Sequence, residues 1–450
     1  MDNYLNQIIS FICESKFENI PANIVLRAKE VVADTLAVMV AGAQEEEVKA
    51  LTSKLVGASG SAASTLFGLG TRTEPLKASI INGTAGTFLE LDEGNQYGRG
   101  HAAIQILPAL FAVAEEQKCS GKDLLTALVV GYEIAIRIGI ACKLRMSMHP
   151  HGSWGTVGAA VAVGKLLGYT ESDMQEIISV SASMTTATNR KTMLEGGTVR
   201  NVYSGLSSHN GLLAHYLIQS GFTGESDGLK TVFGSVVSDT FSTHAMIEEL
   251  GQRYEIGRNY FKQYACCRYN HSALDAVNEI LAKIPNDRLY PADIGEINVA
   301  TYSLAAQLCS CEPGNPLAAK FSIPFALATR IINGHAGVSS FTLAAVHDEA
   351  IKALARKVTV IEDQNLTAMM PDYRPSRVSL TLINGESYSA EAFINKGDAE
   401  DPYSTEEIRE KYFELLDGVY GHERATELYR RTMVLEECDD FNSVTSLLSE

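Results

Sequence analysis

The sequence predicts a mainly α protein, with a large all-helical domain and a smaller α+β domain. Three observations support this fold class. Apolar residues recur at three- and four-residue spacing through most of the first 255 residues. Near residue 260 the pattern changes, and strand-like runs begin to alternate with helical ones. With 450 residues the chain is long enough for roughly two or three domains.

The predicted helical domain begins with an amphipathic segment. Residues 1–20 carry acidic and polar residues inside an apolar pattern and no basic leader, which favours a helix over a signal peptide. Some later segments are rich in Ala and Gly, as in GTVGAAVAVGKLLG, and we expect them at the centre of the domain because small side chains let helices approach closely. Helical spacing recurs over residues 24–40, 75–91, 104–116, 123–142, 157–167 and 173–184.

The smaller domain is predicted over residues 261–397. In the run VSLTLINGESYSAEAFI, Asn384-Gly385 divides two alternating segments and is a strong β-hairpin signal. The preceding elements are a helix over residues 272–283, a strand over 294–302 and a helix over 323–332.

Helical periodicity returns near the end of the chain. The two segments that show it are residues 404–416 and 422–431. We expect residues 398–450 to pack back onto residues 1–260 and to complete the helical domain.

Composition and charge exclude several classes of function. The net charge of −17 and the pI near 5.1 argue against a nucleic-acid binder, which needs a basic face to neutralise phosphates. No basic amphipathic helix indicates a membrane surface, and apolar runs such as ALFAVA are far shorter than the roughly 20 residues of a membrane span. The eight cysteines show no framework spacing, and two are adjacent, so we expect a cytoplasmic protein.

Four short segments concentrate cations in this acidic chain, and each lies at the edge of a helical run. Loops at helix ends let polar groups converge while the scaffold stays packed. Helix N-termini also offer unpaired N–H groups to anions. The segments are GRGH (98–101), HPHGSWG (149–155), NRKTMLEGGTVRNVY (189–203) and FKQYACCRYNH (261–271).

Each segment also has a purely structural interpretation. His101 can be a helix-entry residue without a chemical role. HPHGSWG can be a turn whose Trp154 anchors the next helix, and NRKTMLEGGTVR can be a solvated loop. Cys266 and Cys267 can be buried core thiols, the commonest fate of free cysteines.

Metal and nucleotide sites are weakly supported. The HPH of the second segment and the CC…H of the fourth supply suitable ligand types. However, the chain has no paired CxxC and no HExxH, and a lysine and an arginine in the fourth segment would repel a cation. The sequence GLG at residues 68–70 lacks the third glycine of a dinucleotide fingerprint, and no GxxxxGK[ST] loop occurs.

The four segments together favour an anion site. An acidic protein that concentrates fixed cations in one cleft can hold a small polyanion. Cations beside a carboxylate also stabilise the negative charge that develops when a neighbouring C–H is deprotonated by a base with a tuned pKa. Glu90 and Asp92 are candidate bases. The candidate cations are Arg99, His101, His149, Arg200, Lys262, Arg268 and His271.

Six stretches, in order along nearly the whole chain, carry a resemblance to a known family. They are INGTAGTFLELDEGN, RGHAAIQILPALFAVAEE, HPHGSWGTVGAAVAVGKLLG, SSHNGLLAHYLIQSGFTGESDGL, YFKQYACCRYNHSALDA and AAKFSIPFALA. They resemble the MmgE/PrpD family, which includes 2-methylcitrate dehydratase, cis-aconitate decarboxylase and iminodisuccinate epimerase. The resemblance implies a helical domain built from both chain ends, an α+β lid domain, an active site between them, a homodimer, and catalysis without a metal or an organic cofactor.

The resemblance also places the family's functional residues on this chain. The histidine of the GH motif corresponds to His101, and the histidine that opens the HP-x-G-x-WG stretch to His149. The lysine of the lid's K-x-Y/F motif corresponds to Lys262. The acidic position before the GH loop corresponds to Glu90 or Asp92, depending on the placement of a one-residue gap.

Three departures from the family pattern bear on the substrate. The family's GHPS becomes GHAA, with Ala102 and Ala103. The lysine before the helix of the HNG stretch is Arg200, which keeps the charge but is a poor proton donor. A histidine used by the decarboxylase branch corresponds to Cys267.

We therefore expect a cofactor-independent lyase acting on a small di- or tricarboxylate, with a 2-methylcitrate dehydratase-like hydro-lyase as the leading hypothesis. His101 or Asp92 would take the proton, and His149 and Lys262 would assist the leaving hydroxyl or polarise a carboxylate. The two glycines of GRGH would let the loop approach the substrate. The predicted substrate-binding residues are Glu90, Arg99, Arg200, Tyr203, Arg268 and His271.

Three other functions share these residues. An epimerase would return the proton to the opposite face, and a decarboxylase would lose CO₂ from a carboxylate placed perpendicular to a conjugated system. A non-catalytic binder of carboxylate metabolites is a further alternative, motivated by GHAA and Arg200.

Overall fold

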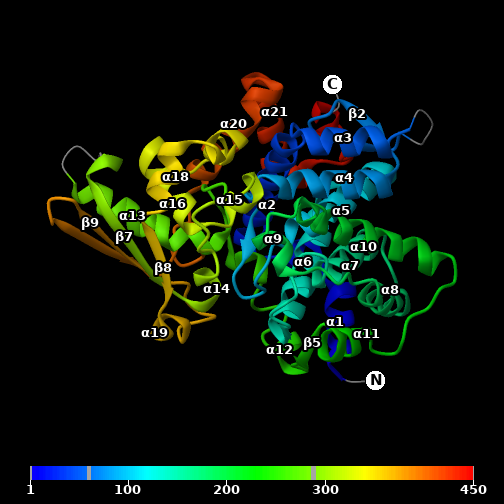
Figure 1. The fold of residues 1–450 in the computed structure, drawn as a ribbon. Helices are drawn as coiled ribbons and strands as arrows, with labels where there is room; N and C mark the ends of the chain where they lie inside the picture. The colour runs from blue at the N-terminus through cyan, green and yellow to red at the C-terminus, as the bar shows by residue number, and fades with distance from the viewer. Residues whose placement is uncertain (1–2, 58–61, 285–289, 449–450) are drawn as a thin grey trace.

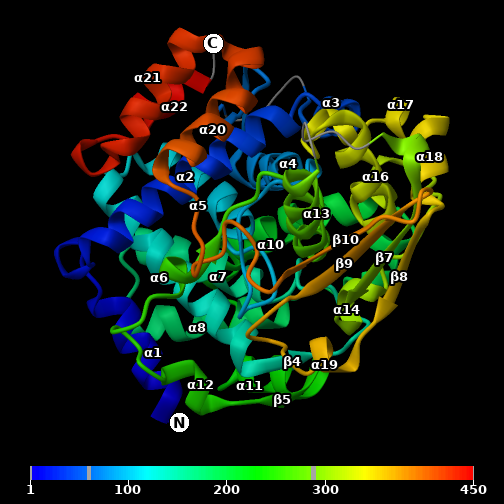
Figure 2. The same cartoon turned by 90° about the vertical axis from the view of Figure 1, so that its left-hand side faces the viewer.

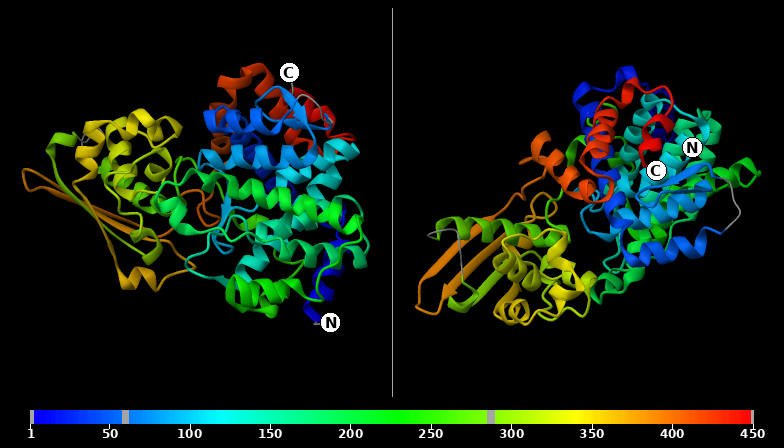
Figure 3. Two further views of the ribbon diagram at one scale, coloured as in Figure 1. Left: turned by 45° about the vertical axis from the view of Figure 1, so that its right-hand side comes forward. Right: turned by 90° about the horizontal axis from the view of Figure 1, so that it is seen from above.

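A larger helical part and a smaller part with a four-stranded sheet lie side by side in the computed structural model, which describes residues 3–57, 62–284 and 290–448. The smaller part is on the left of Figure 1. Figure 2 views the molecule from the side of the smaller part, and Figure 3 shows the sheet projecting away from the helical part. The predicted fold class, mainly α with a smaller α+β part, is confirmed.

The larger part contains the helices that the apolar periodicity predicts, with ends shifted by a few residues. They are α1 Asn3–Glu14, α2 Ala22–Gly42, α4 Pro75–Phe88, α5 Ala103–Gln117, α6 Gly121–Ala141, α7 Trp154–Leu166 and α8 Glu171–Ser183. Local signals fix their starts. Ser120 caps α6 by accepting a hydrogen bond from the Asp123 N–H, and Thr170 and Asp173 form a capping box on α8.

The Gly-rich helices pack at very close range. A Cβ atom at Gly131 of α6 would lie 2.7 Å from the Gly158 carbonyl oxygen of α7. A Cβ atom at Gly83 of α4 would lie 2.7 Å from the Cα atom of Gly205, in α10 Tyr203–Gln219. Because only glycine fits at such contacts, these small residues allow the buried helices at the centre of the larger part to approach.

Helix α6 corrects one prediction. The helix has 21 residues, and the mean hydropathy of its most apolar window is 1.8. It is therefore long and apolar enough to cross a membrane, whereas the apolar runs in the sequence predicted no segment of that length. In the structure 94% of its most apolar window is buried, and Glu133 and Arg137 form an ion pair within it. The helix therefore packs as a core helix of the larger part.

Short two-stranded sheets also occur in the larger part, which helical periodicity did not predict. The pairs are β1 Ser64–Leu66 with β2 Thr71–Thr73, β3 Gly94–Asn95 with β6 Asn259–Tyr260, and β4 Cys142–Leu144 with β5 Ser238–Phe241. The pairing of β3 with β6 matters for the site, because it ties the loop after α4 to the segment that enters the smaller part.

The sheet of the smaller part has the strand order β10-β9-β7-β8. The predicted strand is β7 Ile294–Thr301, and the predicted hairpin is β9 Ser376–Leu382 with β10 Ser387–Ala392. Gly385 adopts a φ of +91° in its turn, a conformation that favours glycine. The parallel strand β8 Val358–Glu362 was not predicted. Helices α13 His271–Lys283 and α16 Ile323–Asn333 pack against this sheet.

The end of the chain returns to the larger part. Helix α20 Thr405–Tyr420 packs against α2, and α21 His422–Met433 follows it (Figure 1). The Lys411 Nζ atom of α20 donates hydrogen bonds to the Asp34 carboxylate at 2.6 Å and to the Leu91 carbonyl at 2.8 Å. The C-terminal helices thus support the loop that precedes His101. The domain limits at residues 260 and 397 stay a prediction.

Candidate active site

A cavity with an empty volume of about 800 Å³ lies where the two parts meet. The larger part contributes Glu90, Arg99, His101, Tyr260 and residues from the segments 144–151 and 190–200. The smaller part contributes Cys267, Arg268, Tyr269, Leu304, Phe321 and Arg374. All four cation-rich segments of the sequence reach this one cavity.

The loop LDEGNQYGRGH is held in a defined conformation by its own backbone. The Asn95 and Gly100 backbones exchange hydrogen bonds at 2.8 and 3.2 Å, and the Asn95 side chain accepts hydrogen bonds from two further N–H groups of the turn. The two glycines of GRGH are required by packing. A Cβ atom would meet Ile136 at Gly98 and Trp154 at Gly100, both at less than 3.0 Å. Their role in substrate approach stays a prediction.

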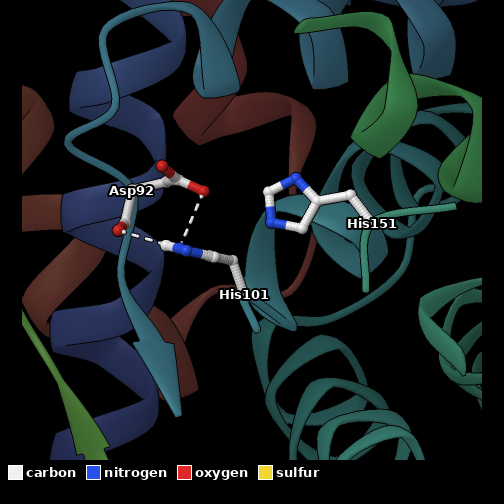
Figure 4. A group of neighbouring side chains, drawn as sticks. All are labelled: Asp92, His101 and His151. Carbon is white, nitrogen blue, oxygen red and sulfur yellow. Dashed lines mark hydrogen bonds and ion pairs between the residues drawn. The ribbon is translucent and has the colours of Figure 1, made fainter. Parts of the chain in front are cut away.

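The loop joins His101 to a buried carboxylate. The His101 Nδ1 atom lies 3.0 Å from Asp92 Oδ2 (Figure 4). It also lies 2.7 Å from the Glu93 carbonyl oxygen. Because a carbonyl can only accept, Nδ1 is the protonated nitrogen, and in a neutral ring Nε2 has a free lone pair. Burial alone would raise the pKa of Asp92, but the charges of His101 and Lys262 outweigh burial and lower it. The pair can therefore act as a histidine base oriented by a carboxylate.

Two further histidines face this pair. The His151 ring lies edge-on to His101 with centroids 4.9 Å apart, and the His149 ring lies 4.7 Å from His151. The His149 Nδ1 atom accepts a hydrogen bond from the His151 backbone N–H, so the proton of a neutral His149 is on Nε2. Burial, reinforced by the charge of Arg200, holds the pKa of both rings well below the ordinary value. Both are neutral near pH 7.

His151 was not among the predicted site residues. The sequence distinguishes it only as a possible metal ligand, and the surrounding HPHGSWG also resembles a simple turn. In the structure its Nδ1 lies 3.1 Å from the Ser204 hydroxyl, and its buried Nε2 has no partner among the described residues. Figure 4 shows the ring turned toward His101.

Lys262 lies behind Asp92 and outside the cavity wall. Its fully buried Nζ donates a hydrogen bond to the Glu90 carbonyl at 2.8 Å and contacts Asp92 Oδ1 at 3.4 Å. The Glu90 carboxylate is itself paired with Arg200. The positive charges of Lys262 and Arg200 therefore balance the negative charges of the Glu90 and Asp92 carboxylates. Lys262 and Asp92 are placed to orient the base, and their contact with substrate stays a prediction.

Six arginines line the cavity, and three of them lack a carboxylate partner. Arg145 pairs with Asp239, Arg200 with Glu90, and Arg268 with Asp398. Among the described residues, no carboxylate oxygen lies within 4.0 Å of the others, which are Arg99, Arg190 and Arg374. Arg190 and Arg374 were not predicted. Arg190 belongs to a segment singled out in the sequence, whereas no local signal distinguishes Arg374.

Two predicted substrate-binding residues do not line the cavity. The His271 Nδ1 atom accepts a hydrogen bond from Arg268 at 2.9 Å, and its Nε2 faces the Cys266 carbonyl at 3.3 Å. Both ring nitrogens are therefore engaged. The Tyr203 hydroxyl donates to Thr192, and its ring packs against His149 with centroids 5.7 Å apart. These two residues contact Arg268 and His149 from behind, and their contact with substrate stays a prediction.

One group of described residues could hold a metal ion. Ligand atoms of Asp92, His101 and His151 all lie within 4.8 Å of one another. The ammonium of Lys262 shares the Asp92 carboxylate and would repel a divalent cation at that position. A reaction without metal stays a prediction.

The buried carboxyl of Glu93, which was not predicted as a site residue, binds three separate segments of the larger part. It accepts hydrogen bonds from the Ala103 N–H and the Tyr132 hydroxyl, both at 2.9 Å, and from the Asn259 amide at 3.3 Å. Burial raises the pKa of Glu93 to about 7. Its contacts anchor the start of α5 beside His101.

This shift predicts a pH dependence of stability. The folded protein keeps a proton on Glu93 that the unfolded chain loses above its ordinary pKa of 4.5, so its contribution to stability declines as the pH rises from about 4.5 to about 7. We expect Glu93→Gln to remove a decline on the order of 3 kcal/mol from the unfolding free energy across this window. Denaturant unfolding at several pH values measures it, with the exposed Glu116→Gln as control. An unchanged slope in Glu93→Gln would contradict the assignment.

Comparison with known families assigns the class of protein. The MmgE/PrpD N-terminal domain matches residues 6–246, and the MmgE/PrpD C-terminal domain matches residues 264–436. The chain therefore belongs to the MmgE/PrpD family, as the sequence motifs predict.

Individual relatives are similar over nearly their full length at low identity. The cis-aconitate decarboxylase-like protein oryM of Aspergillus oryzae is 25% identical, over 99% of this chain and 97% of its own. The cis-aconitate decarboxylase of Aspergillus terreus is 24% identical, over 96% and 93%. The Homo sapiens cis-aconitate decarboxylase is 23% identical, over 96% and 92%.

Proposed function

We propose that this protein is a cofactor-independent lyase that transfers a proton at a carbon next to a carboxylate of a small di- or tricarboxylate. The observation that carries the proposal is the Asp92–His101 pair, whose imidazole lines a cavity that also contains three arginines without carboxylate partners among the described residues. A dehydratase of the 2-methylcitrate type is the leading candidate.

The geometry supports an elimination with His101 as the single proton carrier. The His101 Nε2 atom takes the proton from carbon, a C=C bond forms, and hydroxide leaves with that same proton as water. Asp92 stabilises the imidazolium formed in between. Neutral His149 donates a hydrogen bond from Nε2, as an electrophile and not as an acid, because loss of its proton would leave an imidazolate.

The charges of the cavity support a polycarboxylate substrate. Arg200 and Lys262 are balanced by Glu90 and Asp92, and His149 and His151 are neutral, so the arginines without carboxylate partners supply the surplus positive charge. A substrate with two or three carboxylates would neutralise this surplus.

Decarboxylation is the second candidate, and it is favoured by the similarity to cis-aconitate decarboxylases. The same cavity would hold the carboxylates while His101, in its protonated form, delivers a proton to the carbon that loses CO₂. Cys267 stands where the decarboxylase branch has a lid histidine. Because burial raises the pKa of this thiol to about 11, Cys267 is neutral near pH 7 and does not replace a histidine as a proton carrier.

Proton NMR in D₂O with a panel of acids tests the proposal. The panel contains 2-methylcitrate, citrate, cis-aconitate and iminodisuccinate, incubated with the protein before and after treatment with a chelator. We expect loss of water from a hydroxy acid, with new vinylic signals and no effect of chelation. Loss of CO₂ identifies a decarboxylase, and deuterium uptake without net loss identifies an epimerase. If the protein binds these acids but neither converts nor exchanges protons with any of them, the proposed chemistry is wrong. The protein would then be a non-catalytic binder of carboxylate metabolites.

The assembly and the compartment complete the proposal. A homodimer and a cytoplasmic location, without nucleic-acid or membrane partners, stay predictions.

A further inference from the structure

Arg190 and Arg374 reach the cavity from opposite parts of the molecule. Arg190 is the first residue of α9 Arg190–Leu194 in the larger part, where Asn189 caps the helix and the Arg190 N–H donates to the Ser147 carbonyl. Arg374 precedes β9 in the smaller part. Their guanidinium carbons lie 6.0 and 5.6 Å from the centroid of the same ring, that of Tyr269. Both guanidinium groups therefore lie beside the same aromatic side chain.

Both guanidinium groups are buried with nitrogens that no described residue satisfies. The Nε and Nη2 atoms of Arg190 and the Nε atom of Arg374 have no hydrogen-bond partner among the described residues. Arg190 is 9% exposed and Arg374 is 4% exposed. A buried charge without a partner is costly, and planar guanidinium groups are well suited to bind carboxylates in a bidentate manner.

The three arginines predicted from the sequence, Arg99, Arg200 and Arg268, bind other groups of the protein. Arg200 and Arg268 are neutralised by Glu90 and Asp398, and Arg99 donates to the carbonyls of Gly139 and Cys142. The buried Nε atoms of Arg200 and Arg268 also have no hydrogen-bond partner among the described residues. What distinguishes Arg190 and Arg374 is that each combines a buried, unpartnered nitrogen with the absence of a carboxylate within 4.0 Å in the described part of the chain.

We propose that Arg190 and Arg374, held by Tyr269, form a subsite for a substrate carboxylate that takes no part in the reaction, and that this subsite selects tricarboxylates over dicarboxylates. The inference rests on the proposed function for the identity of the substrate class. Arg374 also donates from Nη2 to the Gln96 carbonyl at 2.8 Å, in the loop that leads to His101. Binding at the subsite therefore connects the smaller part to the catalytic loop.

Calorimetry with two unreactive probes tests the subsite. Propane-1,2,3-tricarboxylate and glutarate have the same carbon chain and differ by one carboxylate. We expect the unaltered protein to bind the tricarboxylate at least tenfold more tightly. Arg190→Met and Arg374→Met should each weaken tricarboxylate binding by about ten- to a hundredfold and leave glutarate binding within about twofold.

Neighbouring cations outside the cavity provide matched controls. Lys191 pairs with Glu195, and Arg377 pairs with Asp363 and Glu391. Lys191→Met and Arg377→Met should bind both probes as the unaltered protein does. Arg190→Lys and Arg374→Lys keep the charge, lose the planar fork, and should give intermediate affinities with an unchanged fold.

Several results would overturn the subsite. Equal weakening of both probes in the Met variants would indicate general attraction by charge and no selective subsite. Unchanged tricarboxylate binding would exclude any contribution. A different result would contradict the proposed function. If the protein binds the tricarboxylate through these arginines but turns over no acid, the subsite is supported and the lyase activity is excluded.

Discussion

Replacing His101 by Asn is expected to lower kcat on the substrate identified by NMR by about 10²–10⁴-fold. The Asn side chain can still donate a hydrogen bond to the Glu93 carbonyl, but it offers no group that takes up a proton near neutral pH. The Asp92 carboxylate cannot substitute directly, because it lies behind the ring and outside the cavity wall.

His209 provides the matched control for this variant. Its Nδ1 atom also faces a backbone carbonyl, that of Leu76 at 3.1 Å, and its ring lies outside the cavity wall. His209→Asn should retain kcat within about twofold, whereas both variants should unfold near the temperature of the unaltered protein. Turnover by a folded His101→Asn protein at the original rate would remove His101 from the mechanism.

Replacing Lys262 by Met is expected to destabilise the protein by about 3–5 kcal/mol, since removal of one partner leaves buried carboxylates without compensation. Glu90 and Asp92 would then share the single charge of Arg200. Denaturant unfolding at pH 7 measures the loss. Lys352→Met, which removes a surface ion pair with Glu349, should change stability by no more than about 0.5 kcal/mol.

The same variant should also change the acid limb of the stability curve. The lowered folded pKa of Asp92 contributes stability above its ordinary pKa of 3.8, and this contribution is lost as the pH falls through the folded pKa. Because burial raises the pKa of Asp92 and Lys262 opposes it, the variant should lose stability at a higher pH. Combining Lys262→Met with Glu90→Gln should restore part of the loss. Stability equal to that of the unaltered protein would contradict the role of Lys262.

The elements that the sequence predicted correctly have local causes. Helices such as α2 and α6 follow from the spacing of their own apolar residues, and the β9–β10 hairpin follows from its Asn-Gly turn. The unpredicted strands depend on distant partners. β8 pairs with β7 after more than fifty intervening residues, and β3 and β6 contain two residues each.

The candidate site shows the same division. Motifs in loops were enough to select His101 and His149, which line the cavity, and Lys262, which supports the base. They did not reveal which cations are neutralised. Arg268 is paired with a carboxylate 130 residues away, whereas Arg374, without any motif, has no carboxylate partner among the described residues. Such differences depend on tertiary contacts that spacing along the chain does not encode.

A crystal structure of the protein with bound propane-1,2,3-tricarboxylate would show whether His101 is placed to take a proton from the substrate. We expect a carbon next to a carboxylate within about 3–4 Å of the His101 Nε2 atom, with a second carboxylate on Arg190 and Arg374. A ligand bound elsewhere, or a His101 ring whose Nε2 points into the protein and away from the ligand, would contradict this expectation.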